Sequence, residues 1–215
     1  MASAAVRPGE PKVNLPFSQA CENNKAPILA VLKQYLTEAA SVLEIGSGTG
    51  QHAVFFAERL PQLRWQTSDR CHMLPGITAW QAQAGLPNLT PPLELDVAVW
   101  PWPVLETDVV FSANTAHIMS WPLVKALVDG VGRVLHADGL FMLYGPFNYD
   151  GRHTSESNAQ FDRMLRTRDP ESGIRDIEAL VLHADKAGLE IIADHAMPAN
   201  NRLLVWRRVS SPAGP

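Results

Sequence analysis

The stretch Val42-Leu-Glu-Ile-Gly-Ser-Gly-Thr-Gly50 decides which fold this sequence predicts. Its first half is a short apolar run, which favours a strand over residues 41–45. Its second half carries glycine at three alternate positions, Gly46, Gly48 and Gly50. Glycine has no Cβ, so the backbone there can adopt positive φ and lie directly against a ligand. A helical pattern resumes at once over residues 51–59, so a ligand-binding loop between a strand and a helix is predicted.

Short strand-like runs alternate with helical segments along the rest of the chain. The first helix is expected to carry Pro27 in its first turn, where the missing N–H is harmless. The last two strands are separated only by a turn at residues 198–201. Such a turn is too short for a crossover, so these strands are predicted to be antiparallel neighbours. The predicted helices cover residues 24–37, 51–59, 71–84 (interrupted at Pro75-Gly76), 122–135, 157–166 and 176–187, and the predicted strands cover 41–45, 63–67, 91–96, 107–111, 140–144, 189–193 and 203–207.

This alternation predicts an α/β fold. The expected architecture is a Rossmann-like, seven-stranded, mostly parallel sheet with helices on both faces and an antiparallel last strand. A chain of 215 residues with 46% hydrophobic and 19% charged residues can bury a full core, so residues 1–215 are predicted to form a single domain. The ends, residues 1–14 and 210–215, are predicted to be flexible.

Charge and cysteine content exclude several classes of function. The net charge of −4 and the pI near 6.0 give no broad positive field, so nucleic-acid binding is not expected. Cys21 and Cys71 form no CxxC pair, and no metal site is predicted. No apolar run approaches the roughly 20 residues that span a bilayer. Because the N-terminus is polar and lacks a secretory pattern, a cytoplasmic protein without membrane contact is expected. The oligomeric state stays open.

Acidic residues end three successive predicted strands. Glu44 precedes the glycine loop, Asp69 ends the second strand, and Asp96-Val97 end the third. Asp69 lies 19 residues after Gly50. A carboxylate about 20 residues after a glycine loop can accept hydrogen bonds from both ribose hydroxyls. The dinucleotide pattern G-x-G-x-x-G would need glycine at position 51, which is Gln51, so an NAD-linked oxidoreductase is the less favoured alternative.

The loop with its preceding acid resembles the first motif of S-adenosylmethionine-dependent methyltransferases, E/D-x-G-x-G-x-G. The resemblance implies that the loop passes beneath the methionine and ribose of S-adenosylmethionine. It further implies that Glu44 suits the cationic ligand, that Asp69 accepts from the ribose, and that Asp96 accepts from the adenine amino group. The predicted cofactor-binding residues are Glu44, Gly46, Ser47, Gly48, Gly50, His52, Asp69, Arg70, Asp96, Val97 and Asn114.

Further segments narrow the resemblance. Over residues 17–208 the chain resembles a family of uncharacterised, methyltransferase-like proteins known as a domain of unknown function. The resemblance implies the fold and the cofactor but not the methyl acceptor. The segments that carry it are Asn114-Thr-Ala-His-Ile-Met-Ser-Trp121, Tyr144-Gly-Pro-Phe-Asn148, Ser155-Glu-Ser-Asn-Ala-Gln-Phe-Asp162 and Arg166-Thr-Arg-Asp-Pro-Glu-Ser-Gly-Ile-Arg-Asp176.

Methyl transfer depends mainly on positioning, because the sulfonium is already a good leaving group. Asn114 and His117 are the candidate catalytic residues. Asn114 follows the fourth strand and would orient the acceptor; the plainer alternative is a turn at the strand end. His117 would act as a base, since the reference pKa of histidine is near 6.5; the alternative is a buried, hydrogen-bonded histidine.

Residues after the fourth and fifth strands, and arginines of the polar segment 145–173 and just beyond it, are candidates for binding the acceptor. The arginines would bind a carboxylate or phosphate, or they pair with nearby aspartates. The expected function is S-adenosylmethionine-dependent methyl transfer to an unidentified small molecule. The alternative is a non-enzymatic protein of this fold that binds the cofactor or a partner. The candidate acceptor-binding residues are Trp121, Tyr144, Asn148, Tyr149, Arg168 and Arg175.

Overall fold

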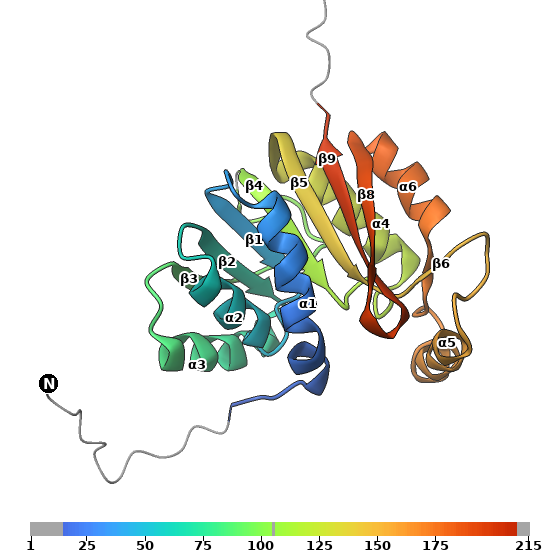
Figure 1. The fold of residues 1–215 in the computed structure, drawn as a ribbon, viewed down its shortest axis with the longest axis horizontal. Helices are drawn as coiled ribbons and strands as arrows, with labels where there is room; N and C mark the ends of the chain where they lie inside the picture. Colours follow the sequence, from blue (N-terminus) through green and yellow to red (C-terminus); the bar gives the residue numbers. More distant parts are fainter. Residues whose placement is uncertain (1–14, 105, 210–215) are drawn as a thin grey trace, which may run out of the picture.

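A seven-stranded sheet runs through the molecule in the order β3-β2-β1-β4-β5-β9-β8 (Figure 1). The structure, a computed structural model, describes residues 15–104 and 106–209. β1 to β5 are parallel, whereas β9 is antiparallel to both β5 and β8, so the predicted fold class is confirmed. The predictions about residues 1–14 and 210–215 concern a part of the chain outside the described residues. The strands of this sheet are β1 Ser41–Ile45, β2 Arg64–Asp69, β3 Leu89–Glu94, β4 Thr107–Ala113, β5 Leu135–Gly145, β8 Leu189–Met197 and β9 Asn201–Arg208.

Helices cover both faces of the sheet (Figure 1). One face carries α1, α2 and α3, and the other carries α4 and α6, while α5 lies apart from both faces, beyond the β8–β9 hairpin. A short parallel pair, β6 (Phe147–Asn148) with β7 (Arg175–Asp176), joins the two ends of the segment that contains α5. The helices are α1 Gln19–Tyr35, α2 Gln51–Arg59, α3 Leu74–Ala84, α4 Trp121–Val134, α5 Glu156–Arg168 and α6 Ile177–Lys186, with 3₁₀ turns at Cys71–Met73 and Pro198–Asn200.

Two apolar clusters, one on each face, hold these layers together. Under α1 and α2, Phe56, Trp65 and Phe111 pack edge-on or tilted, with ring centroids 5.5 to 6.1 Å apart. Under α4 and α6, Phe141 of β5 stacks on Trp206 of β9 at 5.2 Å. Strands buried on both faces explain why the central runs of the sequence are apolar rather than alternating.

The first helix begins earlier in the chain than the sequence predicted. α1 begins at Gln19 because the Ser18 side chain caps it and accepts a hydrogen bond from the Cys21 backbone N–H at 3.4 Å. Pro27 therefore lies inside the helix and not in its first turn. It deprives the Asn23 carbonyl of an intrahelical donor, and Asn23 is exposed, so water can take that place. The earlier start brings the first turn of α1 to the glycine loop.

Two other boundaries bear on function. β3 ends at Glu94, so Asp96 lies two residues beyond the strand and not at its last position. The strand predicted over residues 140–144 is longer in the structure, because β5 begins at Leu135. Among residues 15–104 and 106–209, none of the helices combines the length and the apolar character needed to cross a membrane.

Candidate functional site

A cavity of about 720 Å³ lies where the glycine loop meets the carboxyl ends of β2, β3 and β4. Ligands of open α/β sheets bind at this edge, where the loops after the strands converge. The first turn of α1, the start of α4 and one residue of α5 complete the wall. The lining residues are Ser18, Ala20, Cys21, Ile45, Gly46, Ser47, Gly48, Thr49, His52, Asp69, Arg70, His72, Met73, Leu95, Asp96, Val97, Ala98, Ala113, Asn114, Thr115, His117, Ile118, Met119, Leu123 and Phe161.

The glycine loop is fixed by backbone hydrogen bonds to β2. The N–H groups of Gly46 and Ser47 both donate to the Ser68 carbonyl at 3.0 Å. Gly46 has φ +73°, and a Cβ there would stand 2.6 Å from the Thr115 methyl carbon, so side chains are excluded by packing. Gly48 has φ +58°, and nothing lies within 4 Å of the Cβ it lacks. Gly48 therefore leaves open space beside the backbone on the cavity wall.

Asp69, at the end of β2, holds this loop from the side. Its Oδ2 accepts from the Gly48 N–H at 2.7 Å, and its Oδ1 accepts from the Arg70 N–H at 2.7 Å. A carboxylate offers about four lone-pair positions, so these two bonds orient it while leaving positions for a ligand. Asp69, for which the spacing to the glycines predicts a contact with the ribose, lines the cavity.

Asp96 forms a turn just beyond β3. Its Oδ1 accepts from the Ala98 N–H at 2.9 Å, and the preceding Leu95 N–H donates to the Asp69 carbonyl at 2.9 Å. The two aspartates therefore lie on adjacent, directly linked segments. Arg70 and Val97, which were predicted with them, also line the cavity.

Glu44 is placed beneath the loop and does not line the cavity. It is 2% exposed, and its Oε2 accepts from the Trp65 indole N–H at 2.9 Å. Burial raises the pKa of the Glu44 carboxyl to about 7, against the lowering effect of the Trp65 and Ser47 hydrogen bonds. Gly50 also lies off the cavity wall; it has φ +88° and begins α2 against Ile77 of α3. Both residues support the loop from behind.

Asn114 and His117 stand together on the loop after β4, and both line the cavity. Asn114 adopts φ +61°, a strained backbone conformation for a residue with a side chain, and its N–H donates to the Tyr144 carbonyl at 2.9 Å. His117 is 6% exposed. Burial, and secondarily the charge of Arg175, lowers the pKa of His117 to about 4, so its imidazole is neutral near pH 7. Among the described residues, neither side chain has a hydrogen-bond partner.

Cys21 and His52 form a second pair on the wall. His52 Nε2 lies 2.7 Å from Asn24 Oδ1, and its Nδ1 lies 3.9 Å from Cys21 Sγ. Burial lowers the pKa of His52 to about 4 and raises the pKa of the Cys21 thiol. Both shifts oppose a thiolate–imidazolium pair, so this arrangement is not an activated nucleophile. It joins α1 to α2 beside the glycine loop.

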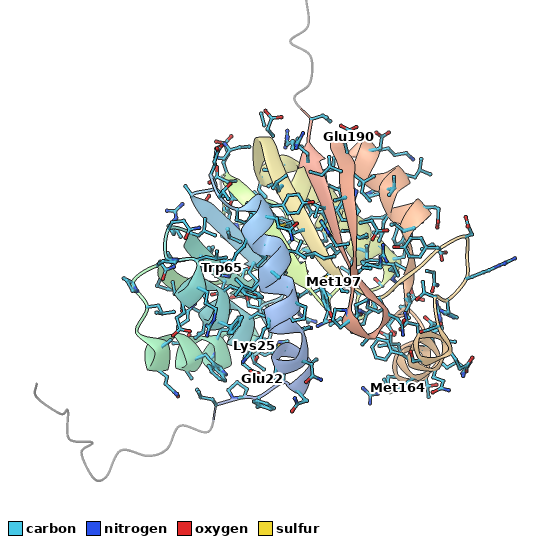
Figure 2. The ribbon with its side chains drawn as sticks, in the orientation of Figure 1. Glu22, Lys25, Trp65, Met164, Glu190 and Met197 are labelled. Carbon is cyan, nitrogen blue, oxygen red and sulfur yellow. The ribbon has the colours of Figure 1, made fainter. Side chains whose placement is uncertain are left out.

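Hydrogen bonds at the start of α1 strengthen that junction. The Ser18 N–H donates to Gln51 Oε1 at 2.5 Å, and Gln51 Nε2 donates to Glu22 Oε1 at 3.0 Å. Glu22 also pairs with Lys25 at 2.5 Å (Figure 2). Gln51 is 3% exposed and occupies the position where a dinucleotide loop would have glycine. Its side chain ties the first turn of α1 to the loop, which explains why this position carries glutamine.

The six candidate acceptor-binding residues do not line this cavity. Tyr144 belongs to the apolar cluster under α1, because its side chain lies on that face of β5. Tyr149 donates to Asp194 Oδ2 at 2.6 Å. Trp121 packs against the core under α4, and Arg168 is exposed at the end of α5. Asn148 forms hydrogen bonds with His153 and with the Ile174 carbonyl. Arg175 donates to the carbonyls of Ala116, Met119 and Glu171.

Several lining residues were not predicted. Phe161 of α5 packs edge-on against His117, with ring centroids 5.2 Å apart. Phe161 is the one aromatic residue in the otherwise largely polar segment 156–168, and this feature of the sequence could have indicated a contact with the rest of the protein. Ile118 and Met119, apolar residues that follow His117 directly, carried a similar signal. Cys21 lies in the first turn of α1, so its place on the cavity wall could be predicted only if α1 was predicted to begin at Gln19.

The fold is shared with methyltransferases of known structure. The mitomycin 7-O-methyltransferase MmcR aligns with a TM-score of 0.78 and 16% identity, covering 88% of this chain and 54% of that one. The S-adenosylmethionine-dependent methyltransferase SibL, solved in its apo form, aligns at 0.76 and 22%, covering 89% and 56%. An O-methyltransferase family 2 protein from Planctomyces limnophilus, solved in complex with apigenin, aligns at 0.76 and 17%, covering 88% and 58%.

These likenesses establish a methyltransferase fold. The chain spans a little over half the length of each of these three proteins. The sequence itself matches one family over residues 15–208, which includes the glycine loop, both aspartates and the loop after β4. The chain belongs to the family described as "Protein of unknown function (DUF938)".

Proposed function

We propose that this protein is an S-adenosylmethionine-dependent methyltransferase that acts on a small-molecule acceptor. The observation that carries the proposal is a single cavity with two chemically different ends. One end brings together the glycine loop and the carboxylates of Asp69 and Asp96, and the other presents the neutral side chains of Asn114 and His117. The methyltransferase fold supports the same conclusion.

The residues present fit the methyl donor. Gly48 leaves open space on the wall where a side chain would intrude. Asp69, oriented by two backbone N–H groups, accepts from the ribose hydroxyls, and Asp96 accepts from the adenine amino group. Bound there, the donor supplies a methyl group activated by a positively charged sulfur. The proposed contact residues are Gly46, Ser47, Gly48, His52, Asp69, Arg70, Asp96, Val97 and Asn114, with Glu44 and Gly50 supporting the loop from behind.

Positioning is the main catalytic task of such a site. Asn114 orients the acceptor with its side-chain amide, and its strained backbone fixes the direction in which that amide projects. His117 is neutral and has no protein partner among the described residues, so a ring nitrogen is available to an acceptor group. In this role both residues affect turnover more than affinity for the methyl donor.

Transfer of an isotopically labelled methyl group tests this function. The protein is incubated with methyl-labelled S-adenosylmethionine and a pool of cellular small molecules below about 1 kDa, and labelled products are sought by mass spectrometry. We expect a labelled product together with S-adenosylhomocysteine, both lost in N114A. The surface variant D185A serves as control, since Asp185 is exposed on α6. Donor binding without any labelled product would instead favour a protein that binds the cofactor without turnover.

A further inference from the structure

The two ends of the cavity lie on opposite sides of the glycine loop. In the strand order β3-β2-β1-β4, Asp69 and Asp96 follow strands on one side of β1, and Asn114 and His117 follow β4 on the other. α5 reaches this second end through Phe161, which packs on His117. If the donor's adenosine occupies the β2–β3 side, as the proposed function requires, the acceptor occupies the end formed by the β4 loop and α5.

Among the described residues that line this acceptor end, none has an ionised side chain. Its lining residues are Asn114, Thr115, His117, Ile118, Met119, Leu123 and Phe161. The Thr115 hydroxyl is already hydrogen-bonded to Ser112 Oγ at 2.7 Å. Arg175, whose charge acts on His117, has its guanidinium directed to backbone carbonyls, including that of Ala116 at 3.1 Å. A carboxylate or phosphate would find no cation here, and an ammonium would find no carboxylate, so burying either is unfavourable.

The walls favour a flat apolar body. The Phe161 ring stands at 68° to the His117 imidazole, and Met119 and Leu123 add flexible and branched apolar surface. Aromatic rings prefer such edge-to-face and offset arrangements to a direct face-to-face sandwich. Among the described side chains that line this end, the His117 ring nitrogens and the Asn114 amide are the polar groups without a hydrogen-bond partner. An acceptor that fits has an apolar ring and one hydrogen-bonding group near its reacting atom.

We infer that the acceptor is an uncharged aromatic molecule carrying a hydroxyl group, and that His117 accepts the proton of that hydroxyl. A bond forms between the hydroxyl oxygen and the methyl carbon, while the methyl–sulfur bond breaks and its electron pair stays on sulfur. The hydroxyl proton passes to a His117 ring nitrogen and later to solvent. The products are an aryl methyl ether, S-adenosylhomocysteine and a transient imidazolium. This inference rests on the proposed function and adds to it the acceptor class.

The basicity of His117 selects an acidic hydroxyl. Burial lowers the pKa of His117 to about 4, which makes the imidazole a weak proton acceptor. Phenolic hydroxyls, with a reference pKa of about 10 in tyrosine, are far more acidic than aliphatic alcohols. Proton transfer in the transition state is efficient only when donor and acceptor are not too far apart in pKa. An aromatic hydroxyl is therefore much closer in pKa to His117 than an aliphatic hydroxyl is, and it is the favoured acceptor of the two.

Matched naphthalene derivatives test the acceptor class by binding, without requiring turnover. The full-length protein, saturated with S-adenosylhomocysteine, is titrated calorimetrically at pH 7 with 2-naphthol, 2-naphthoate and (2-naphthyl)methylamine, which are neutral, anionic and cationic. We expect 2-naphthol to bind at least about tenfold more tightly than either charged analogue. Equal or tighter binding of a charged analogue would overturn the inferred class while leaving donor binding, and with it the proposed function, intact.

Variants of His117 test its role. H117L is expected to weaken 2-naphthol binding about two- to tenfold, the range of one net hydrogen bond, with S-adenosylhomocysteine affinity unchanged within twofold. H117Q retains a hydrogen-bonding side chain but cannot take a proton near pH 7, so it is expected to bind 2-naphthol and fail to methylate it. H136L is the matched control, because His136 is exposed at the start of β5 and does not line the cavity. Full turnover in H117Q overturns the proton-acceptor role, and failure of the wild type to bind S-adenosylhomocysteine overturns both proposals.

Discussion

Replacing Asp69 by alanine removes the carboxylate that we propose to bind the ribose of the methyl donor. The carboxylate has two backbone partners at 2.7 Å, Gly48 N–H and Arg70 N–H, and lines the cavity with its remaining lone pairs. A hydrogen bond to a charged acceptor contributes roughly 1.5–3 kcal/mol. Loss of the ribose contact should therefore raise the Kd for S-adenosylhomocysteine roughly tenfold to 150-fold.

Calorimetric titration of D69A measures this loss, and thermal melting without ligand measures any effect on folding. The two backbone N–H groups border the cavity, where water can replace the carboxylate, so the free energy of unfolding should fall by only about 1 kcal/mol. D185A is the control for removing an exposed acid, and it should leave both quantities unchanged. A Kd for D69A within twofold of the wild type, in a folded protein, would refute the assignment of Asp69 to the ribose.

Three further predictions test the loop, its buried acid and the core. Gly48→Ala should weaken S-adenosylhomocysteine binding. Gly85→Ala is its control, because Gly85 has a similar positive φ and equally open surroundings; both variants should lose roughly 1–2 kcal/mol of stability, but Gly85→Ala should leave binding intact. Equal affinities of the two variants would contradict the inference that the ligand lies against Gly48. The Glu44 pKa is raised from 4.5 to about 7, so its stabilising contribution is full below pH 4.5 and is lost as pH rises through 7. Urea unfolding should show E44Q gaining up to about 3 kcal/mol relative to the wild type between pH 5 and 8, and parallel pH profiles would contradict this. Gly130→Ala places a Cβ 2.1 Å from the Trp102 ring, so chemical denaturation should show a loss of roughly 1–3 kcal/mol, and an unchanged midpoint would contradict the packing.

The end of the cavity that we propose for the methyl donor was largely predictable from the sequence, because it depends on local chain order. The strand over 41–45, the loop and the helix over 51–59 were predicted with the bounds that the structure shows. Asp69 was found by its spacing from Gly50, since a βαβ unit has a nearly fixed length. Asp96, for which the resemblance implies a contact with the adenine, also lines the cavity, although β3 ends two residues earlier than predicted. The role of each of these residues stays a prediction until binding is measured.

The acceptor end was not predictable in the same way, because it depends on side-chain direction and on distant segments. Tyr144 lies in β5 as predicted, but successive side chains of a strand point to opposite faces of the sheet. The sequence does not say which face α1 covers, and in the structure Tyr144 lies on the α1 face and not on the cavity wall. Arg175 was a plausible anion ligand in sequence, yet its guanidinium is used by backbone carbonyls. Phe161 reaches the cavity from 44 residues beyond His117 in the chain, a contact that no local pattern specifies.

The most direct test of the central claim is thermal melting of the protein with S-adenosylmethionine, S-adenosylhomocysteine, NAD or NADP added separately. A ligand at 100 times its Kd stabilises the folded state by about 2.7 kcal/mol. For a chain of this size that corresponds to an increase in Tm of roughly 5–10 °C. We predict this increase with S-adenosylmethionine and S-adenosylhomocysteine and none with NAD or NADP. An increase with NAD or NADP alone, or with none of the four ligands, would contradict the assignment of this cavity to a methyl donor.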